Sequence, residues 1–411
     1  MFIPTFKRHV DLTDNLRGSS VDEHTFIESI SRKLSRTFKF DIEYKKNKHI
    51  PALDGVRGIA IILVLLFHCF PYIKLFKFGW MGVDLFFTLS GFLITGILAD
   101  TVNNSDYYAS FIIKRILRIF PLYYFSLILF LLVIPKIDIL TNVLNLKFSL
   151  AHQEWYWFYA SNWLLSLKSG WTHGAGINHF WSLSVEEQFY ILWPILIYFF
   201  RNRKLLLLCF TTIAISILIR NVLYLNNVSD AALYILSITR ADSLALGGAI
   251  AILIRSIAGI KLLKNYTLPI LVTSSLLLIL GVLFTKSVNP YTSFFTTIGY
   301  TIVDFICGSI IVLSLSNLMD VNNLFSRPIL RFFGKYSYSM YIFHYPIYLI
   351  YTSYLNKHNS QPSIGLDILA SCLTILSTII LSLATWNLLE KRILALKRNF
   401  GKGLEHKNLT R

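Results

Sequence analysis

Residues 53–73 read LDGVRGIAIILVLLFHCFPYI, an apolar run that contains Asp54, Arg57 and His68. Arg57 and His68 are eleven positions apart, so on an α-helix they lie about 20° apart around the axis and about 16 Å apart along it. They therefore share one helical face. The run is long enough to cross a membrane, and ionisable side chains within such a helix are costly to place and usually functional. We predict a membrane helix with Arg57 near one surface and His68 deep inside.

Similar apolar runs recur along the whole chain of 411 residues, which is 55% hydrophobic and only 15% charged, with a mean hydropathy of +0.57. Soluble proteins of this length are not so apolar. We therefore predict an all-α polytopic membrane protein with about ten transmembrane helices, embedded in a lipid bilayer. The expected helices cover residues 53–73, 81–100, 118–135, 187–200, 205–224, 239–254, 267–285, 298–316, 336–354 and 365–388.

The net charge of +17 is explained by topology rather than by nucleic acid, which we exclude as a partner. With the N-terminus in the cytoplasm, most Lys and Arg residues fall in cytoplasmic segments, as the positive-inside rule requires. Both termini are then cytoplasmic. The expected organisation is an N-terminal tail (1–48), a transmembrane domain (49–390) and a basic C-terminal tail (391–411). We expect no cleavable signal peptide, because the first 50 residues are polar and basic, and no soluble domain after the last helix.

No metal site is predicted. The four cysteines lie in apolar segments at irregular spacing, and the ten histidines show no ligand spacing with cysteines or carboxylates.

Two acidic residues and one arginine lie inside apolar segments and need partners. Asp84, near the start of the second segment, either forms a helix-packing ion pair or holds a basic group of a ligand. Arg240 and Asp242 open the sixth segment, where an internal Arg–Asp pair is the simpler interpretation.

Arg115 and Arg118 lie in the expected loop into the third helix, three residues apart and hence on one helical face. Two guanidiniums there suit the phosphates of a nucleotide-bearing cofactor. Positive-inside anchoring, which needs no ligand, is the simpler interpretation.

His179, Glu186 and Glu187 are expected just before the fourth helix, on the outer side. Helix capping accounts for one carboxylate, whereas two carboxylates beside a histidine also allow acid–base or acceptor-binding roles. His344 is expected near mid-membrane in the ninth helix, where a histidine satisfied by its own surroundings is the simpler interpretation. The long aromatic loop, residues 136–186, either packs at the outer interface or stacks on sugar rings.

Taken together and in order, these segments make the chain resemble the acyltransferase-three family of integral membrane O-acyltransferases, over about residues 50–390. The segments that carry the resemblance are Leu53–Gly58 with His68, Gly82–Phe87 with Ser90–Thr95, Arg115–Arg118, Trp181–Tyr190, Arg240–Asp242, and Tyr336–Ser339 with His344.

The resemblance implies transfer of an acyl group, usually acetyl, from cytoplasmic acyl-CoA to a hydroxyl of an extracytoplasmic glycan such as O-antigen, exopolysaccharide or peptidoglycan. It implies a multi-pass protein of the bacterial inner membrane. A succinyl donor is the alternative within this class. A transporter or exporter of a lipid-linked glycan or small solute is the alternative from another class, because intramembrane charges also line transport paths.

The residues give this activity a mechanistic hypothesis. Arg115 and Arg118 bind the phosphates of acetyl-CoA, and its pantetheine arm follows the face shared by Arg57 and His68. His68 is the general base or carries the acyl group transiently. Asp54 or Asp84 orients the imidazole or holds Arg57. Glu186, Glu187, His179, Arg240 and His344 are the candidate acceptor-binding or supporting residues.

Overall fold

The computed structural model describes residues 49–395 apart from 169, 172–175, 202, 257, 317–320 and 358–362. The expected N-terminal tail, residues 1–48, lies outside this part, as does all but the first five residues of the expected C-terminal tail. Every regular element in the described part is helical. The prediction of an all-α fold is therefore confirmed.

Eight helical segments in the described part are long and apolar enough to cross a membrane, which makes the chain a multi-pass membrane protein. They are Pro51–Cys69, Lys74–Thr101, Tyr107–Lys136, Arg203–Leu225, Asp230–Ile254, Asn265–Thr285, Phe295–Leu315 and Ile364–Ala395. Helices α9 (Trp181–Phe199) and α16 (Pro328–Lys357) also have the length to cross, but they are more polar. The count of ten and the orientation of the termini stay predictions.

The long helices fall where hydropathy predicts them, except that four of them begin earlier than expected. The remaining long helices are α2 (Pro51–Cys69), α3 (Met81–Thr101), α4 (Tyr107–Leu127), α10 (Arg203–Leu225), α12 (Ser237–Ile254), α13 (Gly259–Thr285), α14 (Tyr300–Leu315) and α17 (Ile364–Thr385). The shorter elements are η1 (Lys74–Trp80), η2 (Ile128–Val133), η3 (Ile134–Lys136), α5 (Asp138–Val143), α6 (Lys147–Ala151), α7 (Gln153–Trp157), α8 (Ser161–Leu167), η5 (Asn178–Phe180), α11 (Asp230–Ile235), η6 (Phe295–Gly299), α15 (Val321–Phe325) and η8 (Trp386–Glu390).

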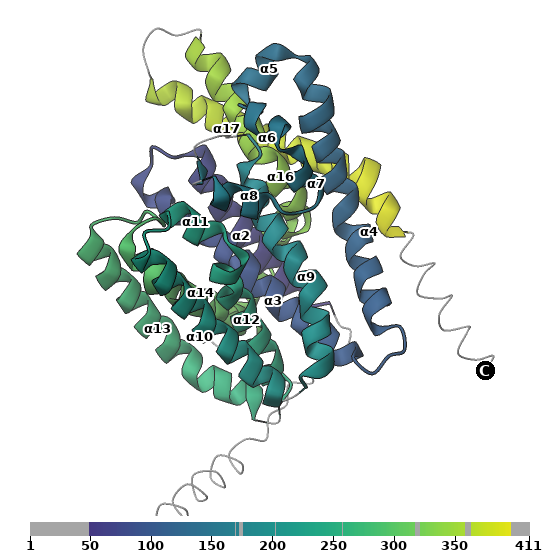
Figure 1. Ribbon diagram of the computed structural model, residues 1–411, viewed down its shortest axis with the longest axis vertical. Helices are drawn as coiled ribbons and strands as arrows, with labels where there is room; N and C mark the ends of the chain where they lie inside the picture. The colour runs from purple at the N-terminus through teal and green to yellow at the C-terminus, as the bar shows by residue number, and fades with distance from the viewer. Residues whose placement is uncertain are drawn as a thin grey trace, which may run out of the picture.

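Helices α2 and α3 form the centre, with α16 packed along α2 and α12 packed along α3. Glycines allow these close approaches. A Cβ on Gly58 would lie 2.0 Å from the carbonyl oxygen of Leu330, and one on Gly91 would lie 1.9 Å from that of Leu244. Figure 1 shows α10, α12, α13 and α14 grouped on one side of this centre and α4 on the other. The Arg57–His68 face of α2 is thereby enclosed by neighbouring helices.

The aromatic loop folds into the short helices α5–α8, and its tyrosines pack inside the protein. The Tyr123 hydroxyl on α4 donates to the Tyr156 carbonyl oxygen at 2.7 Å, and the rings of Tyr123 and Tyr159 stack with centroids 4.0 Å apart. Burial raises the pKa of Tyr156 to about 12, which keeps its hydroxyl neutral. This part of the loop is a packed cap.

Four expected helix starts are too late. Helix α13 begins at Gly259 rather than at 267, and α16 begins at Pro328 rather than at 336. The third helix begins at Tyr107 rather than at 118, because Tyr107, Phe111 and Ile119 form a buried stripe that extends the helix backwards. Arg115 and Arg118 therefore lie inside α4, not in a loop. The fourth helix begins at 181 rather than 187, with no side-chain cap. Its two glutamates lie in its second turn and do not cap it.

Two cavities along one face of helix α2

The first cavity, here called the arginine cavity, has a volume of about 110 Å³ and lies between α2, α3, α4, α9 and α16. It brings three guanidinium groups and two carboxyl groups together. Its polar lining residues include Arg57, Arg115, Arg118, Ser90, Glu186, Glu187 and Tyr190. The arginines outnumber the carboxylates, so the cavity suits an anionic ligand.

The arginines of this cavity are only partly satisfied by the protein. Arg57 Nη1 lies 3.5 Å from Asp54 Oδ1, and Asp54 Oδ2 lies 2.6 Å from His49 Nε2. The Arg115 guanidinium stacks over the rings of Phe111 and Tyr190, at 5.5 and 5.6 Å from their centroids. Its buried Nε has no hydrogen-bond partner. This nitrogen is a donor available to a ligand.

The second cavity, here called the histidine cavity, has a volume of about 260 Å³ and different chemistry. Its polar lining residues are His68, Asn178 and His179, and aromatic rings make up most of its wall. The aromatic lining residues are Phe67, Trp80, Trp171, Trp181, Tyr234, Tyr291, Tyr341 and Tyr345. No Asp, Glu, Lys or Arg is among the described residues that line it.

His68 contacts a second histidine. Nδ1 of His344 lies 2.8 Å from the Tyr341 carbonyl oxygen, which only accepts, so this nitrogen carries a proton. In the neutral ring, Nε2 of His344 is then an acceptor, and it lies 3.1 Å from His68 Nδ1. His68 therefore donates through Nδ1, and its Nε2 is left with a free lone pair. The tautomers of both imidazole rings are thus assigned from their hydrogen-bond partners. In this assignment His68 Nε2 can accept a proton.

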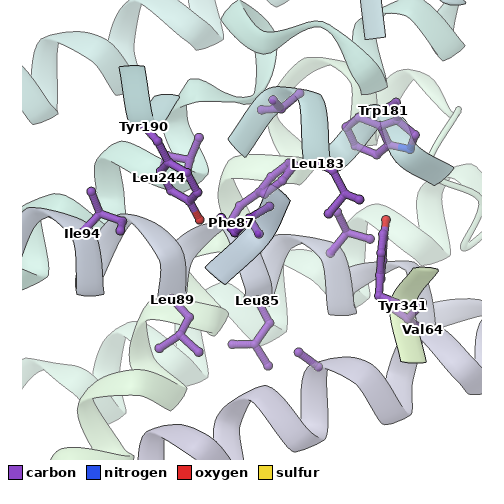
Figure 2. Close-up of a cluster of buried hydrophobic side chains, with 14 of the residues drawn as sticks. Val64, Leu85, Phe87, Leu89, Ile94, Trp181, Leu183, Tyr190, Leu244 and Tyr341 are labelled. Carbon is purple, nitrogen blue, oxygen red and sulfur yellow. The ribbon is translucent and has the colours of Figure 1, made fainter. Parts of the chain in front are cut away.

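The two cavities adjoin at Val83, Tyr341 and Ser182, here called the partition. Val83 and Tyr341 line both of them. The hydroxyls of Tyr341 and Ser182 lie 2.6 Å apart, and the Tyr341 hydroxyl also donates to the His179 carbonyl oxygen at 3.1 Å. Figure 2 shows Tyr190 and Trp181 on opposite sides of the buried side chains of Phe87 and Leu183. Arg57 lines one cavity and His68 the other, as expected for two residues on one helical face.

Asp84 and Arg240 lie outside both cavities, buried in an ion pair with each other. The helix-packing role of Asp84 is thus the one observed. The expected pair of Arg240 with Asp242 is wrong, because residues two apart on a helix point about 200° apart. Asp242 instead pairs with Arg220 at 2.7 Å.

The structure separates some residues that the sequence seemed to group. Glu186 and Glu187 lie in the arginine cavity, whereas His179 lines the histidine cavity. The expected outer cluster of all three is therefore not formed, because the helix turns the carboxylates inward. The partner of His68 is His344 and not Asp54 or Asp84, and Asp54 contacts Arg57.

Three residues that line the histidine cavity, Tyr341, Asn178 and Trp171, were given no role by sequence reasoning. Tyr341 is three residues before His344, so helical spacing with that histidine was an available signal for it. Asn178 lies directly beside His179, and Trp171 was one of many aromatic residues in the loop. Nothing in the sequence distinguished it. Among the described residues, no group of three or more His, Cys, Asp or Glu side chains is arranged to hold a metal ion.

The described helices thus enclose an arginine-rich cavity next to a histidine-containing cavity in a multi-pass membrane protein. A family model described as an acyltransferase domain, Acyl_transf_3, matches residues 50–386. The chain belongs to this acyltransferase-three family. Among solved structures, none matches the chain.

Relatives of this chain carry names that refer to O-acetylation. Peptidoglycan O-acetyltransferase OatA of Listeria monocytogenes is 30% identical over 338 residues, which cover 78% of this chain and 53% of OatA. YrhL of Bacillus subtilis, provisionally named a peptidoglycan O-acetyltransferase, is 29% identical over 347 residues, which cover 75% of this chain and 50% of YrhL. The chain spans about half the length of the curated relatives it matches.

Proposed function

We propose that this chain transfers an acetyl group from cytoplasmic acetyl-CoA to a hydroxyl of an extracytoplasmic glycan. The observation that carries the proposal is that one face of α2 presents Arg57 to an anion-binding cavity and His68 to a neutral, aromatic cavity next to it. The names of the relatives support O-acetylation and favour peptidoglycan as the acceptor class. The protein then works as a multi-pass protein of the bacterial inner membrane.

The arginine cavity is the donor end in this proposal. Arg115 and Arg118 bind the phosphates of acetyl-CoA from the cytoplasmic side, and Arg57 lies further along the path. The unpartnered Nε of Arg115 supports this role, because a buried guanidinium nitrogen gains a charge-assisted hydrogen bond from a phosphate oxygen. Glu186 and Glu187 balance part of the positive charge of the cavity.

The histidine cavity is the reaction end. In this proposal the pantetheine arm has to span the helical rise of about 16 Å between Arg57 and His68. The hydroxyl oxygen of the acceptor attacks the thioester carbonyl carbon, and His68 Nε2 takes the proton of that hydroxyl. A C–O bond forms, the C–S bond breaks, and the proton passes to the thiolate of coenzyme A. His344 holds the imidazole in the required tautomer.

The chemistry of the histidine cavity favours acetyl over succinyl. A succinyl group carries a second carboxylate, which needs a cation or several donors when it is buried. The described lining of this cavity offers neither lysine nor arginine. The acyl chain that fits is therefore short and uncharged.

The test is acetyl transfer in inverted membrane vesicles that contain the full chain and the glycan of the host. Labelled acetyl-CoA is supplied on the exposed cytoplasmic side. We expect His68→Ala to lower transfer about 10²- to 10⁴-fold, the usual contribution of a general base, with the protein still present in the membrane. His152→Ala is the matched control. His152 Nδ1 lies 3.1 Å from the Phe148 carbonyl oxygen, just as His68 Nδ1 lies 3.1 Å from that of Val64, yet His152 lines neither cavity.

Transfer by His68→Ala at the wild-type rate would remove His68 from the mechanism. Wild-type protein that moves label only from succinyl-CoA would correct the donor. Wild-type protein that needs an ion gradient and no acyl-CoA would replace the enzyme with a transporter.

A further inference from the structure

Three buried polar atoms in the wall of the histidine cavity have no hydrogen-bond partner. They are Nε1 of Trp171, Oδ1 of Asn178 and Nδ1 of His179. Asn178 is 6% exposed and His179 is 5% exposed, so bulk water does not satisfy them. Buried polar groups in folded proteins are nearly always paired. Three unpaired polar atoms on one cavity indicate a polar ligand that forms hydrogen bonds with them.

The hydrogen-bonding character of each atom can be assigned. The indole nitrogen of Trp171 only donates, and the Asn178 oxygen only accepts. His179 Nε2 lies 3.1 Å from the Ile342 carbonyl oxygen and therefore carries the ring proton, which makes His179 Nδ1 an acceptor. Together with His68 Nε2, these atoms make up one donor and three acceptors, next to the tyrosine hydroxyls of the same lining. A ligand with several hydroxyls matches this set, because each hydroxyl both donates and accepts.

Another tryptophan in the same wall shows that Trp171 is distinctive. Nε1 of Trp80 donates to the Val288 carbonyl oxygen at 3.0 Å and is therefore satisfied within the protein. The Trp171 indole lies beside Tyr291, with ring centroids 6.4 Å apart, but no well-formed hydrogen bond joins its N–H to the tyrosine hydroxyl. Burial raises the pKa of Tyr291, so this hydroxyl stays neutral.

The remaining wall suits the apolar face of a sugar ring. Trp171 and Trp181 have centroids 6.4 Å apart, and Trp181 and Tyr234 have centroids 5.0 Å apart. The cavity volume of about 260 Å³ is many times the roughly 10–15 Å³ that one water molecule needs, so a pyranose ring has room. The described lining has no carboxylate or permanent cation, so the fitting ring is neutral.

We propose that Trp171, Asn178 and His179 form the acceptor subsite, which binds one neutral pyranose ring through its hydroxyls beside His68. This subsite assignment rests on the proposed function, and it identifies a single sugar ring as the part of the acceptor that the protein recognises. The aromatic wall holds the C–H face of the ring, and the three polar atoms fix its rotation. One hydroxyl then faces His68 Nε2.

Equilibrium dialysis of radiolabelled chitotetraose, a neutral oligosaccharide, against the full chain in detergent micelles tests the subsite without requiring catalysis. We expect the wild type to bind, and Asn178→Leu and Trp171→Phe each to raise the Kd about tenfold. Trp163→Phe is the matched control, because it removes an indole N–H that already donates to Gln188 Oε1 at 3.2 Å. It should bind like the wild type. Thermal stabilisation by coenzyme A, measured in parallel, should be equal in all four proteins.

Absence of chitotetraose binding by the wild type overturns the subsite, and so does unchanged binding by both cavity variants. Failure of the proposed function gives a different result. In that case chitotetraose still binds and the variants still weaken it, while coenzyme A stabilises none of the proteins and no acetyl group is transferred.

Discussion

Two groups of arginines in the membrane-spanning part of this chain have opposite surroundings. Arg240 is fully buried, faces Asp84, and lies over the ring of Tyr300 with its guanidinium carbon 4.6 Å from the centroid. Both arginines have buried nitrogens without a hydrogen-bond partner, Nε and Nη1 of Arg240 and Nε of Arg115, but only Arg115 lines a cavity. The charge of Arg240 is matched inside the protein, whereas the arginine cavity has more guanidiniums than carboxylates. A matched, enclosed charge supports the fold, and an unmatched charge on a cavity is available to a ligand.

The largest expected effect comes from breaking the enclosed pair. Arg240→Ala leaves the Asp84 carboxylate buried without its counter-charge, which costs about 3–5 kcal/mol. We expect little folded protein in the membrane and a strong fall in Tm, measured by thermal unfolding of the detergent-solubilised chain. An Arg240→Ala protein with normal abundance and Tm but no transfer would instead assign Arg240 to the catalytic site and remove the contrast.

An intermediate effect is expected in the arginine cavity. Arg115→Ala removes hydrogen bonds to an anionic donor that are worth about 1.5–3 kcal/mol, so the KM for acetyl-CoA should rise about 10- to 100-fold with an unchanged Tm. Kinetics at varied acetyl-CoA and fixed acceptor measure this. Lys114→Ala is the control, because Lys114 is adjacent, exposed and absent from the cavity lining. Equal effects of both substitutions would favour membrane anchoring over phosphate binding.

The smallest effect is expected at the partition between the cavities. Tyr341→Phe removes the hydroxyl that contacts Ser182 and the His179 carbonyl, each hydrogen bond being worth about 0.5–1.5 kcal/mol. Water then reaches the thioester more easily, and release of coenzyme A without acceptor should rise about 2- to 10-fold. Tyr338→Phe also loses a hydrogen bond, to the Ile119 carbonyl at 3.1 Å, but Tyr338 lines only the arginine cavity. A similar rise in that variant would mean that Tyr341 does not form the partition.

Local sequence patterns predict much of this molecule, and contacts between distant segments account for the rest. Hydropathy indicated the helices, and helical spacing placed Arg57 and His68 on one face. The same information could not distinguish Arg240 from Arg115, because the difference lies in partners contributed by other helices. The contact of His68 with His344 joins residues 276 positions apart. The orphan atoms of Trp171 and Asn178 are visible only once neighbouring groups are in place.

The partition formed by Val83, Tyr341 and Ser182 also has an energetic consequence for the cell. An energised membrane stores about 2.3 kcal/mol per elementary charge for each 100 mV, and a continuous water column through a protein would discharge it. The two cavities adjoin at Val83 and Tyr341, and the hydroxyls of Tyr341 and Ser182 lie 2.6 Å apart at this junction. These side chains therefore stand where such a column would have to pass between the two cavities.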